Sequence, residues 1–504
     1  MVVADSALPG YSRRALLHRL CTIGAGFATG GLLAACGGGS ATNPAASSST
    51  TVASQAPTTA TATPKLSASV AASTSSTTPA VTSTAATEAS ATATSQAAAP
   101  GKAQIELFYQ NWDDLTQYKE SYGAWYNWAF ATFQQQHPEA KVQYVLTPFG
   151  SIVEKIIAGV AGGTPLDGST MSILHGRDLY DKQALSTLDA HIDQVKALAP
   201  SAFFDVANMY RSSQGKYYAL SIYADVSMIG LNSRMLSDVG LDPKAQDVKT
   251  WDDLLRYSDR LTKEDGGKIV QLGFPYNLPG LEEFATWAYA NGGETQDVDV
   301  TKALFNSPQV ADMLHYRATQ YQRFGVNRSP DLKGDLFKIQ KQAMEHTSTG
   351  LQVAVNGGTY VPKGFQYWFI PTPKGPSGSG PGMAAWVNMV GAPTGVKRLD
   401  LSFDLLQTIA GPAGLAKMFE TTKLYPALKD FYQTAAFTQA VKQDAVLGIP
   451  PTLFAQGKTY PFFRRYNDVS KILGPLISDA VAGKRDIQQS LADGAQQVNA
   501  ILQK

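Results

Sequence analysis

The chain of 504 residues carries 42 lysine and arginine residues against 41 aspartate and glutamate residues, so its formal net charge is +1 at pH 7. It has no basic surplus, basic run or interleaving of aromatic and basic residues, which argues against nucleic-acid binding. Both cysteines, Cys21 and Cys36, lie near the N-terminus, so the long remainder has no thiol for a disulfide, a nucleophile or a metal site.

The first 36 residues have the pattern of an exported, lipid-anchored protein. Arg13 and Arg14 precede an apolar stretch, residues 20–35, that is too short to span a bilayer comfortably as a helix. The stretch ends in Leu33-Ala34-Ala35-Cys36, which resembles a bacterial lipobox whose cysteine carries the lipid. The paired arginines also resemble a twin-arginine signal. We therefore expect residues 1–36 to be a signal peptide with a lipobox, exported by the Sec or the twin-arginine route; the alternative is an ordinary signal peptide or a lone membrane helix.

Residues 37–102 are dominated by Ala, Ser, Thr and Pro, without large apolar side chains at a helical or strand period. Burial cannot then offset the entropy cost of ordering the chain, so this segment is predicted to be a disordered tether. Residues 103–504 follow it and are long enough for two domain-sized cores.

The first part of this region alternates strands and helices. Its apolar patterns predict strands at residues 104–112, 141–149 and 169–176. Helical patterns lie between them, from Tyr122 to the His137-Pro138 pair and over residues 151–163. Such alternation implies right-handed crossovers and a mostly parallel sheet, whose ligands bind at the carboxyl ends of the strands. The candidate binding loops are therefore Asn111-Trp112, Phe149-Gly150 and the run from His175 to Asp178.

Further along the chain, several helices carry clear start or stop signals. Thr250 is a predicted N-cap with Asp253 three residues later, and Ser307 is a predicted N-cap followed by a proline. Two more helices are separated by Gly411-Pro412. Residues 469–481 and 487–502 form two apolar helical stripes at the C-terminus.

Several longer stretches of residues 103–504 carry a family resemblance. They include, in chain order, FATFQQQHPEAKVQYVLTPF, IIAGVAGGTPLD, GKYYALSIYADVSMIGLNSRML, ATWAYANGGE and FKIQKQAM. The chain resembles the extracellular solute-binding proteins of ABC importers, and among them the carbohydrate-binding family that includes the maltodextrin-binding proteins. The resemblance implies a periplasmic-binding-protein-like α/β fold, in which two α/β lobes are joined by a hinge crossed more than once and enclose a cleft. The first lobe is expected to hold residues 103–222 and 388–424, and the second residues 223–387 and 425–504.

The chemistry of a sugar ligand indicates which side chains should line such a cleft. A sugar ring presents C–H patches that aromatic side chains cover, and hydroxyls that Asp, Asn, Arg and His satisfy. Family positions match the loop from His175 to Asp178, the carboxylate after the first hinge crossing, the aromatics before "NGG" and the tryptophan of "AAW". The predicted ligand contacts are Asn111, Trp112, His175, Arg177, Asp178, Tyr223, Asp225, Phe284, Trp287, Trp386, Phe463 and Arg464.

Two departures from the family pattern concern these contacts. Thr347-Ser348-Thr349-Gly350 stands where many members have an aromatic "NGPW" motif, and Phe462-Phe463-Arg464 stands where a tryptophan is common. The cleft is therefore not expected to hold the same sugar as the maltodextrin-binding proteins, and a non-sugar solute is the alternative ligand.

The expected function is solute capture without catalysis. A membrane-anchored protein on the extracellular or periplasmic face would bind a mono- or oligosaccharide and deliver it to the transmembrane subunits of an ABC permease. We expect it to act as a monomer and to need no metal or cofactor. The alternative is an anchored glycoside hydrolase. However, the adjacent pairs Asp113-Asp114, Asp252-Asp253 and Glu282-Glu283 cannot face each other about 5 Å apart across a glycosidic bond.

Overall fold

The computed structural model describes residues 104–503, apart from 206–214, 277, 279, 298–299, 330, 357–364, 455 and 460–464. The predicted signal peptide, Cys36 and the tether lie outside the described residues, as do Phe463 and Arg464. The described residues belong to one compact unit, Lys102–Lys504. Within the described residues, no helix combines the length and the apolar character needed to cross a membrane.

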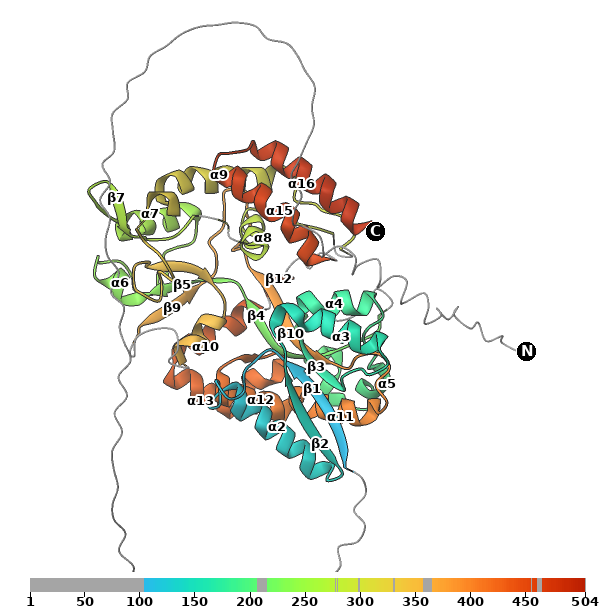
Figure 1. Cartoon of the computed structure of the whole chain (residues 1–504). Coiled ribbons are helices and arrows are strands. Elements are labelled where there is room, and N and C mark those ends of the chain that lie inside the picture. Colours follow the sequence, from blue (N-terminus) through green and yellow to red (C-terminus); the bar gives the residue numbers. More distant parts are fainter. Residues whose placement is uncertain are drawn as a thin grey trace, which may run out of the picture. The chain divides into compact units, whose positions relative to one another are not determined.

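A seven-stranded sheet, counted over the described residues, forms the larger of the two main sheets. Its strand order is β11-β4-β10-β3-β1-β2, and β12 pairs with β10 (Figure 1). The strands are β1 Ile105–Asn111, β2 Ala140–Leu146, β3 Gly168–Ser172, β4 Leu220–Val226, β10 Ala384–Gly391, β11 Tyr425–Pro426 and β12 Lys458–Thr459. The expected parallel pairing holds for β1 with β2 and β3, whereas β10 runs antiparallel to β3 and β4. The prediction of a mostly parallel sheet was therefore wrong for the middle of the sheet, because β10 runs opposite to β3 and β4, although β12 pairs with β10 in parallel.

Helices cover both faces of this larger sheet. On one face, α2 (Tyr122–Gln136) contacts α11 (Leu399–Ala410) and α12 (Pro412–Thr422), and the Tyr109 ring of β1 lies against Tyr126 of α2. On the other face, α3 (Ile152–Ala161) contacts α4 (Ile173–Asp181), and Gln110 Nε2 donates to the Ile152 carbonyl at 3.4 Å. Alternate residues of β1 thus face the two helix layers, as the period of a strand requires. Four further short helices of the described chain are α5 Asp189–Ile192, α10 Gly350–Asn356, α13 Ala435–Gln443 and α14 Ile449–Phe454.

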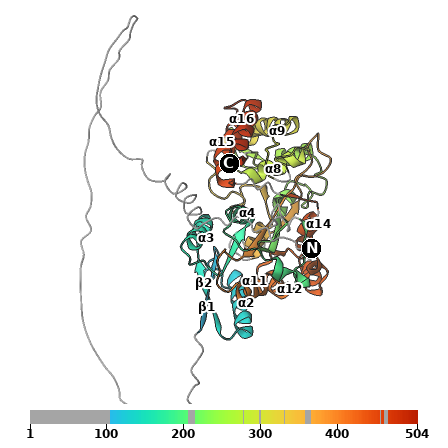
Figure 2. The same cartoon turned by 90° about the vertical axis from the view of Figure 1, so that its right-hand side faces the viewer.

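A three-stranded antiparallel sheet in the described residues, of order β8-β5-β9, organises the rest of the unit. Its strands are β8 Met344–Thr347, β5 Met228–Asn232 and β9 Tyr367–Ile370, and a hairpin pairs β6 Lys263–Asp265 with β7 Lys268–Gln271. Its helices are α6 Ser233–Ser237, α7 Trp251–Leu261, α8 Leu281–Ala290, α9 Pro308–Phe324, α15 Tyr466–Val481 and α16 Ile487–Leu502. Helices α9, α15 and α16 contact one another, and Figures 1 and 2 both show them at the end opposite to β1, β2 and α2.

The helix signals read from the sequence are confirmed. At the start of α7, Thr250 Oγ1 accepts from the Asp253 N–H at 3.3 Å, and Asp253 Oδ2 accepts from the Thr250 N–H at 3.0 Å. The Ser307 side chain caps α9. The predicted third strand ends earlier than expected, at Ser172, and His175 lies in the first turns of α4.

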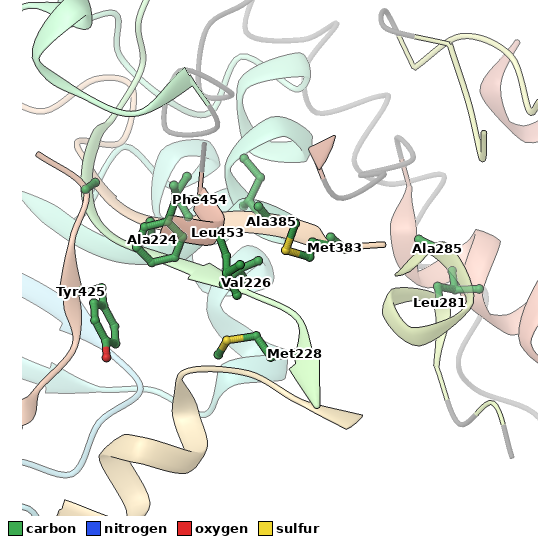
Figure 3. Packing of buried hydrophobic residues seen from close by; sticks show 14 of the residues in the cluster. Ala224, Val226, Met228, Leu281, Ala285, Met383, Ala385, Tyr425, Leu453 and Phe454 are labelled. Atoms are coloured by element: carbon green, nitrogen blue, oxygen red, sulfur yellow. The ribbon is translucent and has the colours of Figure 1, made fainter. Parts of the chain in front are cut away.

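The two sheets are connected by strand β4, which leads through Ser227 directly into β5. Figure 3 shows the apolar side chains of this crossing: Ala224 and Val226 of β4 lie near Leu453 and Phe454, and Met228 of β5 lies beyond them. The predicted lobe boundary after residue 222 falls inside β4, which continues in the larger sheet to Val226. The predicted boundary after residue 424 falls directly before β11, which pairs with β4. The division into lobes stays a prediction.

Candidate functional site

The carboxyl ends of three neighbouring parallel strands bring an aromatic group together. Trp112 follows β1, Phe149 follows β2, and His175 lies just after β3 at the start of α4. The ring of Phe149 is 5.2 Å from that of Trp112 and 4.4 Å from that of His175, centroid to centroid. Trp112 and His175 lie 6.2 Å apart. The loops predicted from the strand pattern therefore meet at one edge of the sheet, where ligands of parallel sheets bind.

Asn111 shapes the loop that carries Trp112. Asn111 is fully buried, and its Oδ1 accepts from the backbone N–H of Trp112 at 2.7 Å. Its Nδ2 donates to Asp113 Oδ2 at 3.2 Å. Burial raises the pKa of Asp113 to about 7, while the hydrogen bond from Asn111 opposes this shift. The contacts of Asn111 are thus mostly within the loop.

The crossing strand β4 and its neighbour β10 present three further predicted contacts on one face. Asp225 of β4 pairs with Trp386 of β10, and Tyr223 pairs with Asn388 in the same antiparallel register. Because side chains alternate along a strand, Tyr223, Asp225 and Trp386 share a face of the sheet. Tyr223 and Trp386 are partly exposed, whereas Asp225 is buried.

The carboxylate of Asp225 connects the crossing strand to the segment before α10. Its Oδ1 accepts from the N–H and the hydroxyl of Thr349, at 2.8 and 2.7 Å, and from the Val226 N–H at 2.8 Å. Its Oδ2 accepts from the Ser348 hydroxyl at 3.0 Å. Burial raises the pKa of Asp225, and these hydrogen bonds oppose the shift. Oδ2 is the oxygen with the greater remaining capacity to accept from a ligand hydroxyl.

The charged residues of α4 are held by ion pairs and by a contact to α15. Arg177 Nε lies 3.3 Å from Asp181, and Asp178 Oδ2 lies 3.3 Å from Lys182 Nζ. Asp178 Oδ1 also accepts from the backbone N–H of Arg465 at 3.0 Å, just before α15. Asp178 therefore links a helix of the larger sheet to a helix beside the three-stranded sheet.

Phe284 and Trp287 were expected at the ligand, but the structure places both in the core beside α9. Their side chains are 2% and 0% exposed, and the Trp287 ring lies 5.5 Å from that of Trp251. Arg317 of α9 lies over the Trp287 ring, 4.2 Å from its centroid. In this conformation a ligand cannot reach either ring, because α8 is buried on nearly all sides.

Two residues near the strand-end edge were not among the predicted contacts. Phe149 was predicted only as part of a candidate binding loop, although an aromatic residue in the loop that follows a parallel strand could have indicated a contact. Glu282 is the second residue of α8 and is partly exposed. Burial, and then the nearby charges of Asp225 and Glu283, raise the pKa of Glu282 to about 8. Its environment thus favours the neutral acid near pH 7.

Two surface hollows of about 420 and 530 Å³ lie elsewhere, around Trp128 on α2 and the start of α12. No predicted ligand contact lines either hollow. Within the described part of the chain, no group of three or more His, Cys, Asp or Glu side chains is placed to hold a metal ion.

Comparison with protein families gives a match over residues 128–445, which is more than half of the chain, to the model described as bacterial extracellular solute-binding protein. The chain belongs to this family. A comparison of this solute-binding protein with curated protein sequences found no significant match.

Solved structures share the fold of this solute-binding protein at low sequence identity. An ABC substrate-binding protein of Listeria monocytogenes in complex with cycloalternan has a TM-score of 0.66 and 18% identity, covering 79% of this chain and 99% of its own. The cyclic α-maltosyl-1,6-maltose binding protein of Arthrobacter globiformis has the same values. The GacH receptor of Streptomyces glaucescens, studied unliganded and with acarbose, has a TM-score of 0.65 and 16% identity, covering 80% of this chain and 100% of its own. The periplasmic-binding-protein-like α/β fold predicted from the sequence is confirmed.

Proposed function

We propose that this solute-binding protein captures a carbohydrate for an ABC importer. The observation that carries the proposal is the aromatic and carboxylate composition of the strand-end edge, where Trp112 packs against Phe149 and Asp113 bonds to Asn111 in the same loop. Aromatic faces and hydrogen-bond acceptors are what a sugar ring requires. The similar folds of proteins solved with cycloalternan and acarbose support this ligand class.

The proposed mechanism is capture by closure of two lobes. A saccharide bound at the strand-end edge would contact both lobes and raise the population of the closed form by its differential affinity for that form. The lobes are those proposed from the sequence, 103–222 with 388–424 and 223–387 with 425–504. The closed protein would then dock on the transmembrane subunits of the permease. In this proposal it is a monomer, and its lipid holds it at the extracellular or periplasmic face of the cell membrane. In this proposal the saccharide is released intact to the permease.

The test of this proposal is calorimetric titration of the purified chain with mono- and oligosaccharides, polyols and sugar acids. Each mixture is also incubated and analysed for ligand breakdown. Saturable binding with intact saccharide supports capture. Turnover would favour an anchored hydrolase, and binding of non-sugar solutes alone would overturn the carbohydrate assignment.

Replacing Trp386 by alanine is expected to raise the dissociation constant for the saccharide at least tenfold. The partly exposed ring shares its face with Tyr223 and Asp225, and its loss removes apolar area that would cover the sugar. Titration of the variant measures the change, with thermal melting to verify the fold. Trp368→Ala on β9, a partly exposed tryptophan under the Lys244 ammonium, is the control and should bind normally. An unchanged dissociation constant for Trp386→Ala would remove this residue from the site.

Replacing Cys36 by serine is expected to release the protein from membranes into the soluble fraction. Serine has no thiol to carry a lipid, so the anchor predicted from Leu33-Ala34-Ala35-Cys36 cannot form. Fractionation of cells that express each form, followed by immunodetection, measures the shift. Cys21→Ser is the matched control and should stay with the membrane. Membrane association of the Cys36→Ser protein would contradict the lipobox.

A further inference from the structure

Phe149 is an exposed aromatic residue at the binding edge of the larger sheet. Its side chain keeps 44% of its surface exposed, although it packs against two other rings. It begins the short 3-10 helix Phe149–Ser151, which Thr147 and Pro148 separate from the end of β2. A large apolar side chain in water gains nothing for folding from the surface that it exposes. A ligand that covers this surface would gain that burial.

The two rings behind Phe149 hold it in place. Its ring is tilted by 50° to that of His175 and stands at 75° to that of Trp112, which is an edge-to-face contact. His175 is 7% exposed and Trp112 is partly buried, so both belong to the packed end of the sheet. The segments that follow β1, β2 and β3 thus position one exposed ring. We call Trp112, Phe149 and His175 the aromatic ledge.

The surroundings of the aromatic ledge do not favour an anion. Burial lowers the pKa of His175 to about 4, so its ring is neutral near pH 7. The cations of α4 are already engaged, Arg177 with Asp181 and Lys182 with Asp178, and on α3 the Lys155 ammonium donates to Thr147 Oγ1 at 3.1 Å. The carboxyl of Asp113 stands next to Trp112 in the chain and adds negative charge when it ionises. An uncharged ring surface therefore fits the ledge better than a phosphate or a carboxylate.

We propose that the aromatic ledge receives an uncharged sugar ring, and that Phe149 is the residue whose ring stacks on it. This inference rests on the proposed capture of a carbohydrate and specifies the part of the ligand that is recognised. Sugar phosphates and sugar acids bind more weakly at this ledge than their neutral counterparts, because the cations of α4 are paired, Lys155 is bound to Thr147, and Asp113 adds negative charge next to Trp112.

The experiment compares Phe149→Ala and Phe149→Trp with the wild-type chain. The probes are glucose, maltose and mannobiose, each titrated calorimetrically, with glucose 6-phosphate and glucuronate as anionic counterparts. For the neutral sugars that bind, Phe149→Ala should raise the dissociation constant at least tenfold. Phe149→Trp keeps an aromatic face and should stay within about threefold of wild type. Phe108→Ala is the matched control, because Phe108 is 42% exposed on β1 but lies three residues before the strand ends, and it should bind as wild type does.

The outcomes separate this inference from the proposed function. If the wild-type chain binds a neutral sugar and Phe149→Ala binds it equally well, the ledge is overturned while carbohydrate capture stands. Equal or tighter binding of glucose 6-phosphate or glucuronate would also overturn the ledge. If the wild-type chain binds none of the sugars, carbohydrate capture fails, and the inference fails with it. Melting temperatures of Phe149→Ala and Phe108→Ala within a few degrees of wild type show that lost binding is not lost folding.

Discussion

Replacing Arg317 by methionine is expected to lower the free energy of unfolding by about 3–5 kcal/mol, the cost typical of breaking a buried ion pair from one side. Arg317 on α9 is fully buried, and its Nη2 lies 2.6 Å from Glu283 Oε1 on α8. Methionine fills much of the same space but leaves the Glu283 carboxyl without its cation. Burial already raises the pKa of Glu283 to about 7 with Arg317 present, so the unpaired acid is strongly disfavoured in its charged form. Urea denaturation at neutral pH measures the loss.

The pH dependence of this loss has a definite sign. A carboxyl whose pKa is higher in the folded than in the unfolded protein stabilises the fold when protonated, and that contribution is lost as the pH rises through its folded pKa. Removal of Arg317 raises the folded pKa of Glu283 further. The destabilisation by Arg317→Met should therefore be larger at pH 8 than at pH 5.

A control and a double variant define the result for Arg317. Arg323→Met breaks an exposed pair on the same helix, where Arg323 lies 2.6 Å from Asp259, and should cost less than about 1 kcal/mol. Arg317→Met with Glu283→Met replaces both charges by apolar groups and should recover most of the stability. Two results would contradict the role of the buried pair between α8 and α9. One is that Arg317→Met lowers the free energy of unfolding no more than Arg323→Met does. The other is that the losses in the single variants Arg317→Met and Glu283→Met simply add in the double variant.

Features set by neighbouring residues were predicted correctly from the sequence. The capping box at Thr250 and Asp253 joins residues three positions apart, so the local pattern contains all of its partners. The same holds for the first strand and for α2, whose apolar periods match their buried faces. The first and third strands also place Trp112 and His175 at one edge of the sheet, because the carboxyl ends of parallel strands lie at the same edge.

The features that the sequence did not predict depend on distant partners. Trp287 looked like a ligand contact because the family places aromatics there, but Arg317 and Trp251 bury it. No local period distinguishes an aromatic residue in a core from one at a ligand when nearly every position of its helix is buried, as in α8. Asp225 and Thr349 are 124 residues apart, so their hydrogen bonds appear only in the folded chain.

Asp225 is the second position where a large effect is expected. Replacing it by alanine should lower the free energy of unfolding by about 2–4 kcal/mol, because buried donors lose a charged acceptor. The affected donors are the N–H groups of Val226 and Thr349 and the hydroxyls of Ser348 and Thr349. Thr349→Val keeps the shape of the side chain and removes one of these hydroxyls, so it should cost about 1–1.5 kcal/mol.

A double-mutant cycle between Asp225 and Thr349, repeated with the bound saccharide, separates the two roles of the carboxylate. If Asp225 connects the crossing strand to the segment before α10, the double variant loses less than the sum of the single losses, by about 1 kcal/mol. Additive losses would contradict this connection. The titrations with saccharide test the role of Asp225 in binding. Asp225→Ala should weaken saccharide binding far more than Thr349→Val only if Oδ2 accepts a hydrogen bond from a sugar hydroxyl. Equal, small changes in both dissociation constants would mean that Asp225 acts on binding through the crossing alone, because Thr349→Val disturbs the crossing without removing an acceptor for the sugar.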